Sequence, residues 1–146
     1  MSPEIFLAAM LLITAGAWLG RRMIRRRRQR VLQQLATQWQ MHYSPADRFH
    51  LGQRISKHFP VCGAGDLYVR DLIYGSGEGR YRYVFTAEFT QGVVRAKRRV
   101  RRVAAFTEPK DLARQDQDIR VELAPAELSL LEQYKCHAGA DRQTVS

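Results

Sequence analysis

The longest apolar segment of the chain lies at its N-terminus, where Ile5–Leu19 contains no charged residue. Thr14 and Gly16 interrupt it only mildly, and no polar face recurs at helical spacing. Such a segment predicts a helix surrounded by lipid, because a core helix or an interfacial amphipathic helix needs a polar side. The uncharged stretch gives roughly 24 Å of helix, so flanking residues must help it cross a hydrocarbon core of about 30 Å. We assign residues 1–20 to a transmembrane anchor.

A cationic block follows directly, because Arg21–Arg30 holds seven arginines in ten positions. Positive charge beside a span stays on the cytoplasmic side. We therefore expect a single-pass protein of the cell (inner) membrane, with its N-terminus outside and its C-terminal domain cytoplasmic. A cleaved signal peptide is the main alternative, since Ala15-Gly16-Ala17 resembles a cleavage box. A signal peptide carries its positive charge before the apolar segment, however, and Met1–Glu4 contains no Lys or Arg.

The helix is expected to continue beyond the membrane, because Arg21–Met41 contains no Pro or Gly. Apolar residues recur in its second half at helical spacing. This packing stripe consists of Val31, Leu32, Leu35 and Trp39. We assign residues 21–43 to a basic juxtamembrane helix whose stripe packs on the sheet of its own chain or on a second copy, as in a homo-oligomer.

Residues 44–136 show the alternation and turn signals of a small antiparallel sheet with short packing helices, a fold of the α+β class. Ser44-Pro45 predicts a helix cap followed by a first-turn proline. About four strands are expected, over Asp66–Tyr74, Arg80–Thr90, Lys97–Thr107 and Ile119–Leu123. Short helices are expected over Leu51–His58 and Pro125–Lys135, and residues 137–146 are expected to form a disordered tail.

The strand Arg80–Thr90 has the clearest pattern. Every second residue is aromatic or small, namely Tyr81, Tyr83, Phe85, Ala87 and Phe89. Alternation of this kind places these side chains on one face of a sheet. We expect that face to be the core of the domain, covered by the packing stripe of the first helix.

The net charge of +10 is concentrated in two runs. Arg21–Arg30 and Arg95–Arg102 hold 13 of the 24 Lys and Arg residues, and the remaining 11 stand against 14 Asp and Glu. Outside the runs the protein is slightly acidic, so we expect local contacts with anionic groups rather than general coating of nucleic acid. The expected contact residues are Arg21, Arg22, Arg25, Arg26, Arg27, Arg28, Arg30, Arg95, Lys97, Arg98 and Arg99.

The second run has two interpretations. Basic side chains on both faces of a strand exclude a central buried strand and indicate a hairpin tip or a sheet edge, where charge prevents edge-to-edge aggregation. As a functional surface, the run would bind anionic lipid headgroups or an acidic partner. In an antiparallel order, the Gln91–Arg99 connection lies at the Gly63 end of the sheet. If that end faces the bilayer, both runs face it, at about 1 kcal/mol per basic residue.

No motif for a metal, a cofactor or catalysis has the required spacing. Gly75-x-Gly77-x-Gly79 lacks the remaining features of a kinase glycine loop, and Gly63-x-Gly65 lacks the third glycine of a dinucleotide site. His58 and Cys62 flank Pro60, which breaks a helical pair of zinc ligands. We expect no cofactor, no metal and no enzymatic activity, with an enzyme whose site the sequence does not reveal as an alternative.

A membrane-tethered nucleic-acid-binding protein is a further alternative. Tyr81, Tyr83 and Phe85 beside arginines are similar to the stacking face of an RNA-recognition sheet. The RNP1 pattern needs small residues where Arg80 and Arg82 stand, so the match fails. Exposed rings would favour this alternative, and buried rings would favour a core face.

The order of features resembles a group of uncharacterised bacterial single-span membrane proteins. These combine an N-terminal apolar helix, an Arg-rich juncture, a segment like Ser44-Pro45-Ala46-Asp47-Arg48-Phe49 and a small sheet rich in Tyr and Phe. The resemblance implies a topology and transfers no activity. The sequence therefore favours a membrane-anchored cytoplasmic interaction or scaffold module, such as an accessory subunit, that contacts anionic lipid or an acidic partner.

Overall fold

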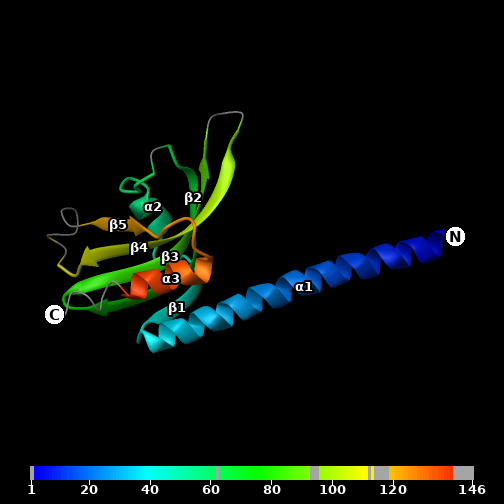
Figure 1. Cartoon of the computed structure of the whole chain (residues 1–146), viewed down its shortest axis with the longest axis horizontal. Helices are drawn as coiled ribbons and strands as arrows, with labels where there is room; N and C mark the ends of the chain where they lie inside the picture. Colours follow the sequence, from blue (N-terminus) through cyan, green and yellow to red (C-terminus); the bar gives the residue numbers. More distant parts are fainter. Residues whose placement is uncertain (1, 62, 93–95, 112, 114–118, 140–146) are drawn as a thin grey trace.

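The computed structural model describes residues 2–61, 63–92, 96–111, 113 and 119–139. Within these residues, a long N-terminal helix is followed by a five-stranded sheet and two shorter helices (Figure 1). The helices are α1 (Pro3–Gln38), α2 (Leu51–Ile55) and α3 (Leu130–Gly139). The strands are β1 (His42–Ala46), β2 (Gly65–Gly77), β3 (Arg80–Gln91), β4 (Arg98–Pro109) and β5 (Arg120–Leu123). The fold belongs to the α+β class, as the sequence predicts.

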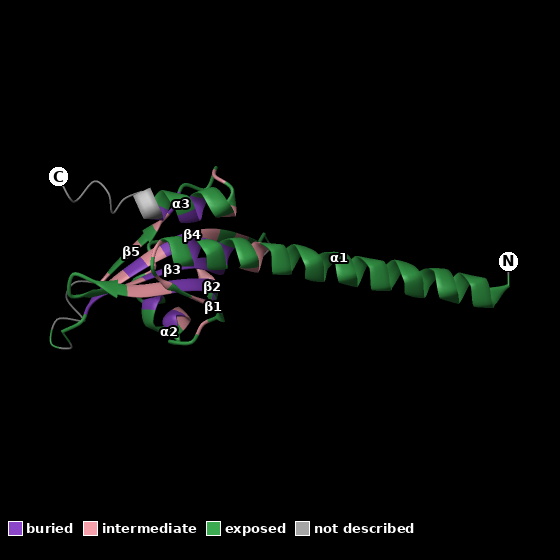
Figure 2. Ribbon diagram, turned by 90° about the horizontal axis from the view of Figure 1, so that it is seen from below, coloured by how far each residue is buried: buried purple, intermediate pink, exposed green. Residues whose placement is uncertain are grey.

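α1 is one uninterrupted helix of 36 residues, which confirms that the helix continues past the apolar segment. Pro3 starts it, where a missing N–H costs no helical bond, and Gln40 adopts a left-handed conformation (φ 57°) just after its end. Its N-terminal part projects away from the sheet with exposed side chains (Figures 1 and 2). By length and composition α1 is able to cross a membrane, and a signal sequence would share these properties.

The strands of the described sheet follow the order β1-β2-β3-β4-β5, and each neighbouring pair is antiparallel. β3 lies at the centre, so its side chains are buried on both faces from Tyr83 to Phe89. Gln91 pairs with Arg98 at the end of the sheet where Gly65 begins β2. The connection before β4 therefore lies at the Gly65 end, as the antiparallel order predicted.

β1 is a strand where Ser44 and Pro45 predicted a helix cap, so the described sheet has five strands instead of four. Ser44 pairs with Leu72 of β2, and its hydroxyl donates to the Ala46 carbonyl oxygen. Pro45 is tolerated because β1 is an edge strand, where one N–H can be missing from the ladder. Asp47 takes the capping role instead, since its carboxylate accepts two backbone N–H groups of α2 at 2.9 and 3.0 Å.

The aromatic face of the sheet is covered by α2. It carries the odd-numbered β3 residues Tyr83, Phe85, Ala87 and Phe89. Leu51 and Ile55 of α2 are fully buried against this face. α2 ends at Ile55, earlier than the expected His58, and Phe59 beyond it stacks edge-on against Phe89 at 5.1 Å between ring centres. The prediction that the first helix covers the aromatic face is therefore wrong.

α1 and α3 cover the opposite face, which we call the helix face (Figure 2). Leu32 and Leu35 of the packing stripe are buried there against Ile73, Val84 and Val103. The even-numbered positions of β3 are as well buried as the odd ones, because β3 is central. The alternation therefore identified both faces of the strand without indicating which helix covers which face.

The packing stripe also differs in composition from the prediction. Val31 is 40% exposed, and Trp39 is only partly buried. Ala36 is buried in their place, beside Leu32 and Leu35. A small residue at this position lets the end of α1 approach the sheet closely.

α3 begins at Leu130 instead of Pro125 and continues to Gly139. Residues 137–139, expected in a disordered tail, are therefore helical. The remainder of the expected tail, residues 140–146, lies outside the described residues.

A capping box that the sequence interpretation missed sets the start of α3. The Ser129 N–H donates to the Glu132 carboxylate at 3.0 Å, and the Glu132 N–H donates to the Ser129 hydroxyl at 3.4 Å. These bonds to Ser129 lower the pKa of Glu132. The Ser-x-x-Glu spacing of Ser129 and Glu132 is the signal that could have located this boundary.

Candidate functional site

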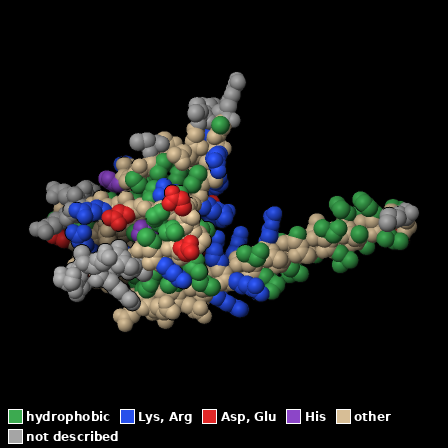
Figure 3. Space-filling model, in the orientation of Figure 1, with side chains coloured by type: hydrophobic (Ala, Val, Ile, Leu, Met, Phe, Trp, Pro, Cys, Tyr) green, Lys and Arg blue, Asp and Glu red, His purple; other side chains and the backbone are tan. Residues whose placement is uncertain are grey.

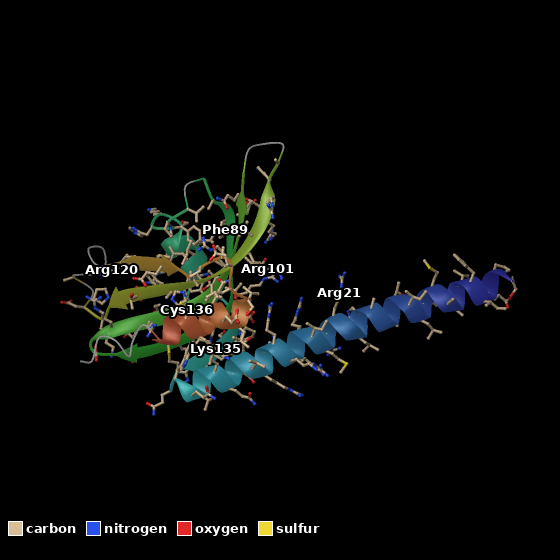
Figure 4. The ribbon with its side chains drawn as sticks, viewed as in Figure 1. Arg21, Phe89, Arg101, Arg120, Lys135 and Cys136 are labelled. Atoms are coloured by element: carbon tan, nitrogen blue, oxygen red, sulfur yellow. The ribbon has the colours of Figure 1, made fainter. Side chains whose placement is uncertain are left out.

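One side of α1 changes from apolar to basic as the helix leaves the sheet. Arg21, Arg25, Arg28, Leu32 and Leu35 are spaced by three or four residues, so they lie on the same side of the helix. The two leucines are buried, Arg28 is half-buried, and Arg21 and Arg25 are exposed. Figure 4 shows Arg21 projecting on the side of α1 where the sheet lies. The side of α1 that packs on the sheet thus continues toward the N-terminus as a row of arginines.

Arg28 binds Asp71 of β2 through an ion pair of 2.8 Å between Nη2 and Oδ2. Tyr43 of β1 donates its hydroxyl to the other carboxylate oxygen, also at 2.8 Å. Asp71 is only 5% exposed, and it adopts a left-handed conformation (φ 50°) where β2 shifts register against β3. Burial, followed by the bond to Asp71, raises the pKa of Tyr43, so this hydroxyl stays a donor at neutral pH. A buried carboxylate without partners would be costly, so Arg28 and Tyr43 stabilise its place in the fold.

Tyr134 of α3, which covers the same face as α1, also contacts Asp71. Its hydroxyl donates to the Asp71 carbonyl oxygen at 2.7 Å and lies 2.8 Å from Oγ1 of Thr86. Burial raises the pKa of Tyr134, so this hydroxyl also stays protonated. α1, β1, β2, β3 and α3 therefore meet in one polar network. Directional bonds in this network, together with apolar packing, set the angle at which α1 leaves the sheet.

Glu88 of β3 gathers three arginines on the helix face. Its side chain is 5% exposed, whereas those of Arg70, Arg99 and Arg101 are 50, 49 and 55% exposed. Arg101 Nε lies 2.9 Å from Glu88 Oε1, and Arg99 Nη2 lies 3.2 Å from Oε2. Arg70 Nη1 is more distant, at 3.8 Å from Oε1. One buried carboxylate thus holds three guanidinium groups, and the cluster keeps two excess positive charges.

Arg99 is held from a second direction by an aromatic ring. The centre of its guanidinium group lies 5.1 Å from the centre of the Tyr68 ring, within the range of a cation–π contact. The ring and the Glu88 carboxylate together restrict the orientations open to Arg99. Its guanidinium group is therefore held in place by two contacts within the protein.

We call the surface formed by Arg21, Arg25, Arg70, Arg99 and Arg101 the basic corner. α1 supplies its first two arginines and the sheet supplies the other three. In Figure 3, Lys and Arg side chains gather where the sheet meets α1, and Figure 4 places Arg101 on this side. The corner therefore lies beside α1, on the side from which its apolar part extends.

The remaining arginines of the first run are distributed around α1. Arg22, Arg26, Arg27 and Arg30 are exposed, and the guanidinium group of Arg22 lies 5.1 Å from the centre of the Trp18 ring. Arg28 alone among the seven is half-buried, and it forms the ion pair with Asp71. The contact of this run with an anionic surface stays a prediction.

Part of the second run lies where β4 extends beyond the described part of β5 and pairs with β3 alone. Lys97 and Arg98 are exposed, and Arg95 lies outside the described residues. The described part of β5 pairs only with Ala104–Thr107, so the first residues of β4 have a partner strand on one side only. This arrangement matches the hairpin tip or edge that the sequence indicated, and charge at such an edge prevents association of sheets.

The other part of the second run has partners within the protein. Arg99 and Arg101 bind Glu88, and Arg102 donates to the Ala124 carbonyl oxygen at 2.5 Å. Edge protection does not need a buried carboxylate beneath the arginines. The sequence interpretation missed Glu88 because it lies on a different strand, and the only local signal is an acidic residue among the apolar positions of β3.

The aromatic residues of β3 do not form an open stacking surface. Tyr83 is 6% exposed, and its hydroxyl donates to Glu108 Oε1 at 3.0 Å, beside an ion pair between Arg54 and Glu108. Burial, followed by the bond to Glu108, raises the pKa of Tyr83 to about 12. Only Tyr81, at 39% exposed, offers part of its ring to solvent. The buried ring of Tyr83 favours a core face over a nucleic-acid platform.

Metal ligands do not converge in the part of the chain that the structure describes, where no group of three or more His, Cys, Asp and Glu could hold an ion. Cys62, considered with His58 as a zinc ligand, lies outside that part. A cavity of about 140 Å³ lies between α1 and α3. Its lining is mostly apolar and consists of Arg28, Val31, Leu32, Thr86, Leu130, Leu131 and Tyr134.

Comparison of the chain with protein-family models, with curated proteins and with solved structures finds no match.

Proposed function

We propose that the chain is a single-span membrane protein whose sheet domain acts as an interaction or scaffold module at the cytoplasmic face of a cell membrane. Residues 1–20 would be the anchor, and the domain would face anionic headgroups. The observation that carries this proposal is the continuity of α1, whose exposed apolar half and sheet-bound half form one helix. A flexible linker would let the domain rotate freely relative to the membrane. The continuous helix α1 would instead fix which side of the domain faces the membrane. The proposal assigns a binding role and no catalytic one.

The position of the basic corner along α1 supports this orientation. Arg28 follows Arg21 by seven residues, so the two lie roughly 10 Å apart along the helix axis. The headgroup region on each side of a bilayer is about 5–8 Å thick. With Arg21 at the edge of the hydrocarbon core, the contact of Arg28 with Asp71 lies near the outer limit of the headgroups. The basic corner beside this contact then faces the headgroups.

The charge of this surface supplies the attraction. Each basic residue near an anionic leaflet contributes about 1 kcal/mol, and the contribution decreases within a Debye length of roughly 8–10 Å. Arg21 and Arg25 lie within this distance of the membrane boundary if the apolar segment spans it. Positive charge on this side of a span also favours the cytoplasmic orientation.

A topology experiment tests the first half of the proposal. A reporter fused after Ser146 of the full chain should be active only when the reporter works in the cytoplasm. The mature protein should keep its N-terminal segment. Activity of a periplasmic reporter, or a mature N-terminus that begins after Ala17, would show a cleaved signal peptide or the opposite orientation.

Hydrogen exchange tests the second half. The full chain is placed in nanodiscs of anionic or neutral lipid, and amide exchange is followed in the peptides that contain the end of β3 and the start of β4. Anionic lipid should slow exchange there at low salt, and Arg98→Glu should weaken this effect. Arg120→Glu is the matched control, because Arg120 is exposed and lies on the side of the sheet away from α1 (Figure 4). Equal exchange in both lipids would contradict the proposal and leave the second run as edge protection.

A further inference from the structure

The arrangement of the arginines on the sheet is more typical of an anion-binding site than of a solvated charged surface. Solvated arginines are usually mobile and unpaired, whereas Arg70, Arg99 and Arg101 share one buried carboxylate. The contact of Arg101 with Glu88 is made by Nε, at 2.9 Å from Oε1, and the Arg101 side chain is 55% exposed. Planar guanidinium groups held in this way bind phosphate oxygens by paired hydrogen bonds at a low cost in side-chain entropy.

The net charge of this cluster indicates the net charge of the ligand that it would bind best. Three guanidinium groups and one carboxylate leave two positive charges at the surface. A phosphate monoester carries roughly −1.5 to −2 charges at neutral pH. A phosphate diester carries a single charge and has fewer oxygens free to accept hydrogen bonds. The cluster therefore matches a monoester better than a diester.

An apolar cavity lies on the helix face of the sheet, the same face as the cluster. The cavity between α1 and α3 is lined by Thr86, which precedes Glu88 by two residues on the same face of β3, and by Arg28. Val31, Leu130 and Leu131 supply apolar walls. A phosphate joined to an acyl chain can use both the arginines and the cavity, whereas free phosphate can use only the arginines.

We infer that the basic corner is a binding site for the phosphate-monoester headgroup of a membrane lipid, held by Arg70, Arg99 and Arg101 around Glu88. Arg21 and Arg25 approach the same headgroup layer from α1. The inference rests on the proposed function, because it needs the corner to lie beside a membrane. It adds that this surface selects one headgroup chemistry instead of responding to negative charge in general.

The test measures lipid binding to the full chain in a nonionic detergent by native mass spectrometry. The probes are dihexanoyl phosphatidic acid, which is a monoester, dihexanoyl phosphatidylglycerol, which is a diester, and glycerol 3-phosphate, which is a monoester without acyl chains. Phosphatidic acid should bind about tenfold more tightly than phosphatidylglycerol, the gain expected from one further charge-assisted hydrogen bond. Glycerol 3-phosphate should bind more weakly than phosphatidic acid.

Glu88→Gln distinguishes a built site, meaning one whose arginines are held in place by Glu88, from a non-selective charged surface. The substitution adds one positive charge, so a non-selective surface would bind both lipids more tightly. A built site loses its preference for phosphatidic acid, because the arginines lose their shared partner. Glu78→Gln is the matched control: it makes the same change of charge at an exposed position in the β2–β3 connection, at the opposite end of β3 from Glu88, and should keep the preference.

Arg101→Lys gives a second variant in case Glu88→Gln does not fold. It keeps the charge and removes the planar fork, so the preference for phosphatidic acid should decrease while binding of phosphatidylglycerol stays the same. Arg120→Lys, at an exposed position of β5 on the side of the sheet away from α1 (Figure 4), should leave both affinities unchanged.

The outcomes separate the two proposals. Equal binding of both lipids, weakened by salt, would overturn the monoester site and leave the proposed anionic contact standing. Binding of neither lipid would contradict both. Glycerol 3-phosphate binding as tightly as phosphatidic acid would overturn the assignment to a lipid and indicate a soluble phosphate monoester.

Discussion

Arg28 of α1 and Asp71 of β2 are 43 residues apart in the sequence and 2.8 Å apart in the fold. This ion pair joins the helix that resembles a membrane span to β2, the neighbour of the central strand. Arg28 therefore differs from the other arginines of its run, because it contacts the domain whereas they are exposed.

Arg28→Gln should destabilise the domain by about 1–2 kcal/mol, because it leaves the buried Asp71 carboxylate with fewer partners. The expected loss is modest because the Arg28 side chain is 38% exposed and solvent screens its charge. Urea unfolding of the full chain in detergent, followed by circular dichroism, measures the change. Arg27→Gln is the control, since Arg27 is exposed on the same turn of α1. Equal effects of the two substitutions would show that the ion pair contributes little.

Leu32→Ala should cost about 2–5 kcal/mol, because it opens a cavity between α1 and the helix face. Val31→Ala, at the neighbouring position, should cost much less, since Val31 is 40% exposed whereas Leu32 is 2% exposed. The same unfolding experiment compares the two variants. If Val31→Ala were the more damaging substitution, α1 would contact the sheet through a different side.

Gly92→Ala should destabilise the end of the β3–β4 hairpin by roughly 1–3 kcal/mol, because its backbone conformation strains any side chain. Gly92 has φ 124°, and a Cβ there would lie 2.6 Å from the carbonyl oxygen of Ala96. Gly77→Ala is the control, because a Cβ at Gly77 meets nothing within 4 Å and its φ is not in the left-handed region. Thermal unfolding of the full chain provides the comparison, and equal melting temperatures for the two variants would contradict the expected strain.

The stability of the domain should fall as the pH is lowered through the ordinary range of histidine, because His137 is buried. Burial lowers the pKa of His137, Arg82 adds to this effect, and a backbone bond with Val103 and the charge of Glu122 oppose it. The unfolded chain therefore binds the proton more tightly than the folded chain. Stability should be constant above about pH 6.5, fall below it, and level off once the pH passes the folded-state pKa.

The free energy of unfolding of the full chain, measured from about pH 8 to about pH 5, tests this dependence on His137. His137→Asn should flatten the part of the profile that lies just below the ordinary pKa of histidine. His58→Asn should leave it unchanged, since His58 is exposed. An unchanged profile in the first variant would assign the pH dependence to other groups.

Several parts of the fold could be derived from local sequence. The uninterrupted α1 follows from the absence of Pro and Gly between Arg21 and Met41. The three long strands appear close to their expected positions, because period-two alternation and glycine-containing connections are local signals. Orientation in a membrane also rests on local order, since the arginines directly follow the apolar segment, and it stays a prediction.

The contacts that build the candidate site could not be derived in this way. In the sequence, Glu88 is only a charged residue within an apolar strand. In the fold, the strand register places Arg101 opposite Glu88, and Arg99 and Arg70 lie near its carboxylate. Asp71 acquires its role only when Arg28 and Tyr43 arrive from other elements. Partners so distant in sequence leave no periodic signal in either segment.

The sequence by itself determined which residues are apolar, the long helix and the three long strands, and where positive charge is concentrated, because these properties depend on neighbours within a few positions. The tertiary structure decided which face of β3 receives α1, that Ser44 and Pro45 join the sheet edge, and which arginines are held in place. Both faces of a central strand are buried, so alternation cannot choose between them. That choice depends on strand pairing and on the burial of Asp71 and Glu88 with partners from other elements.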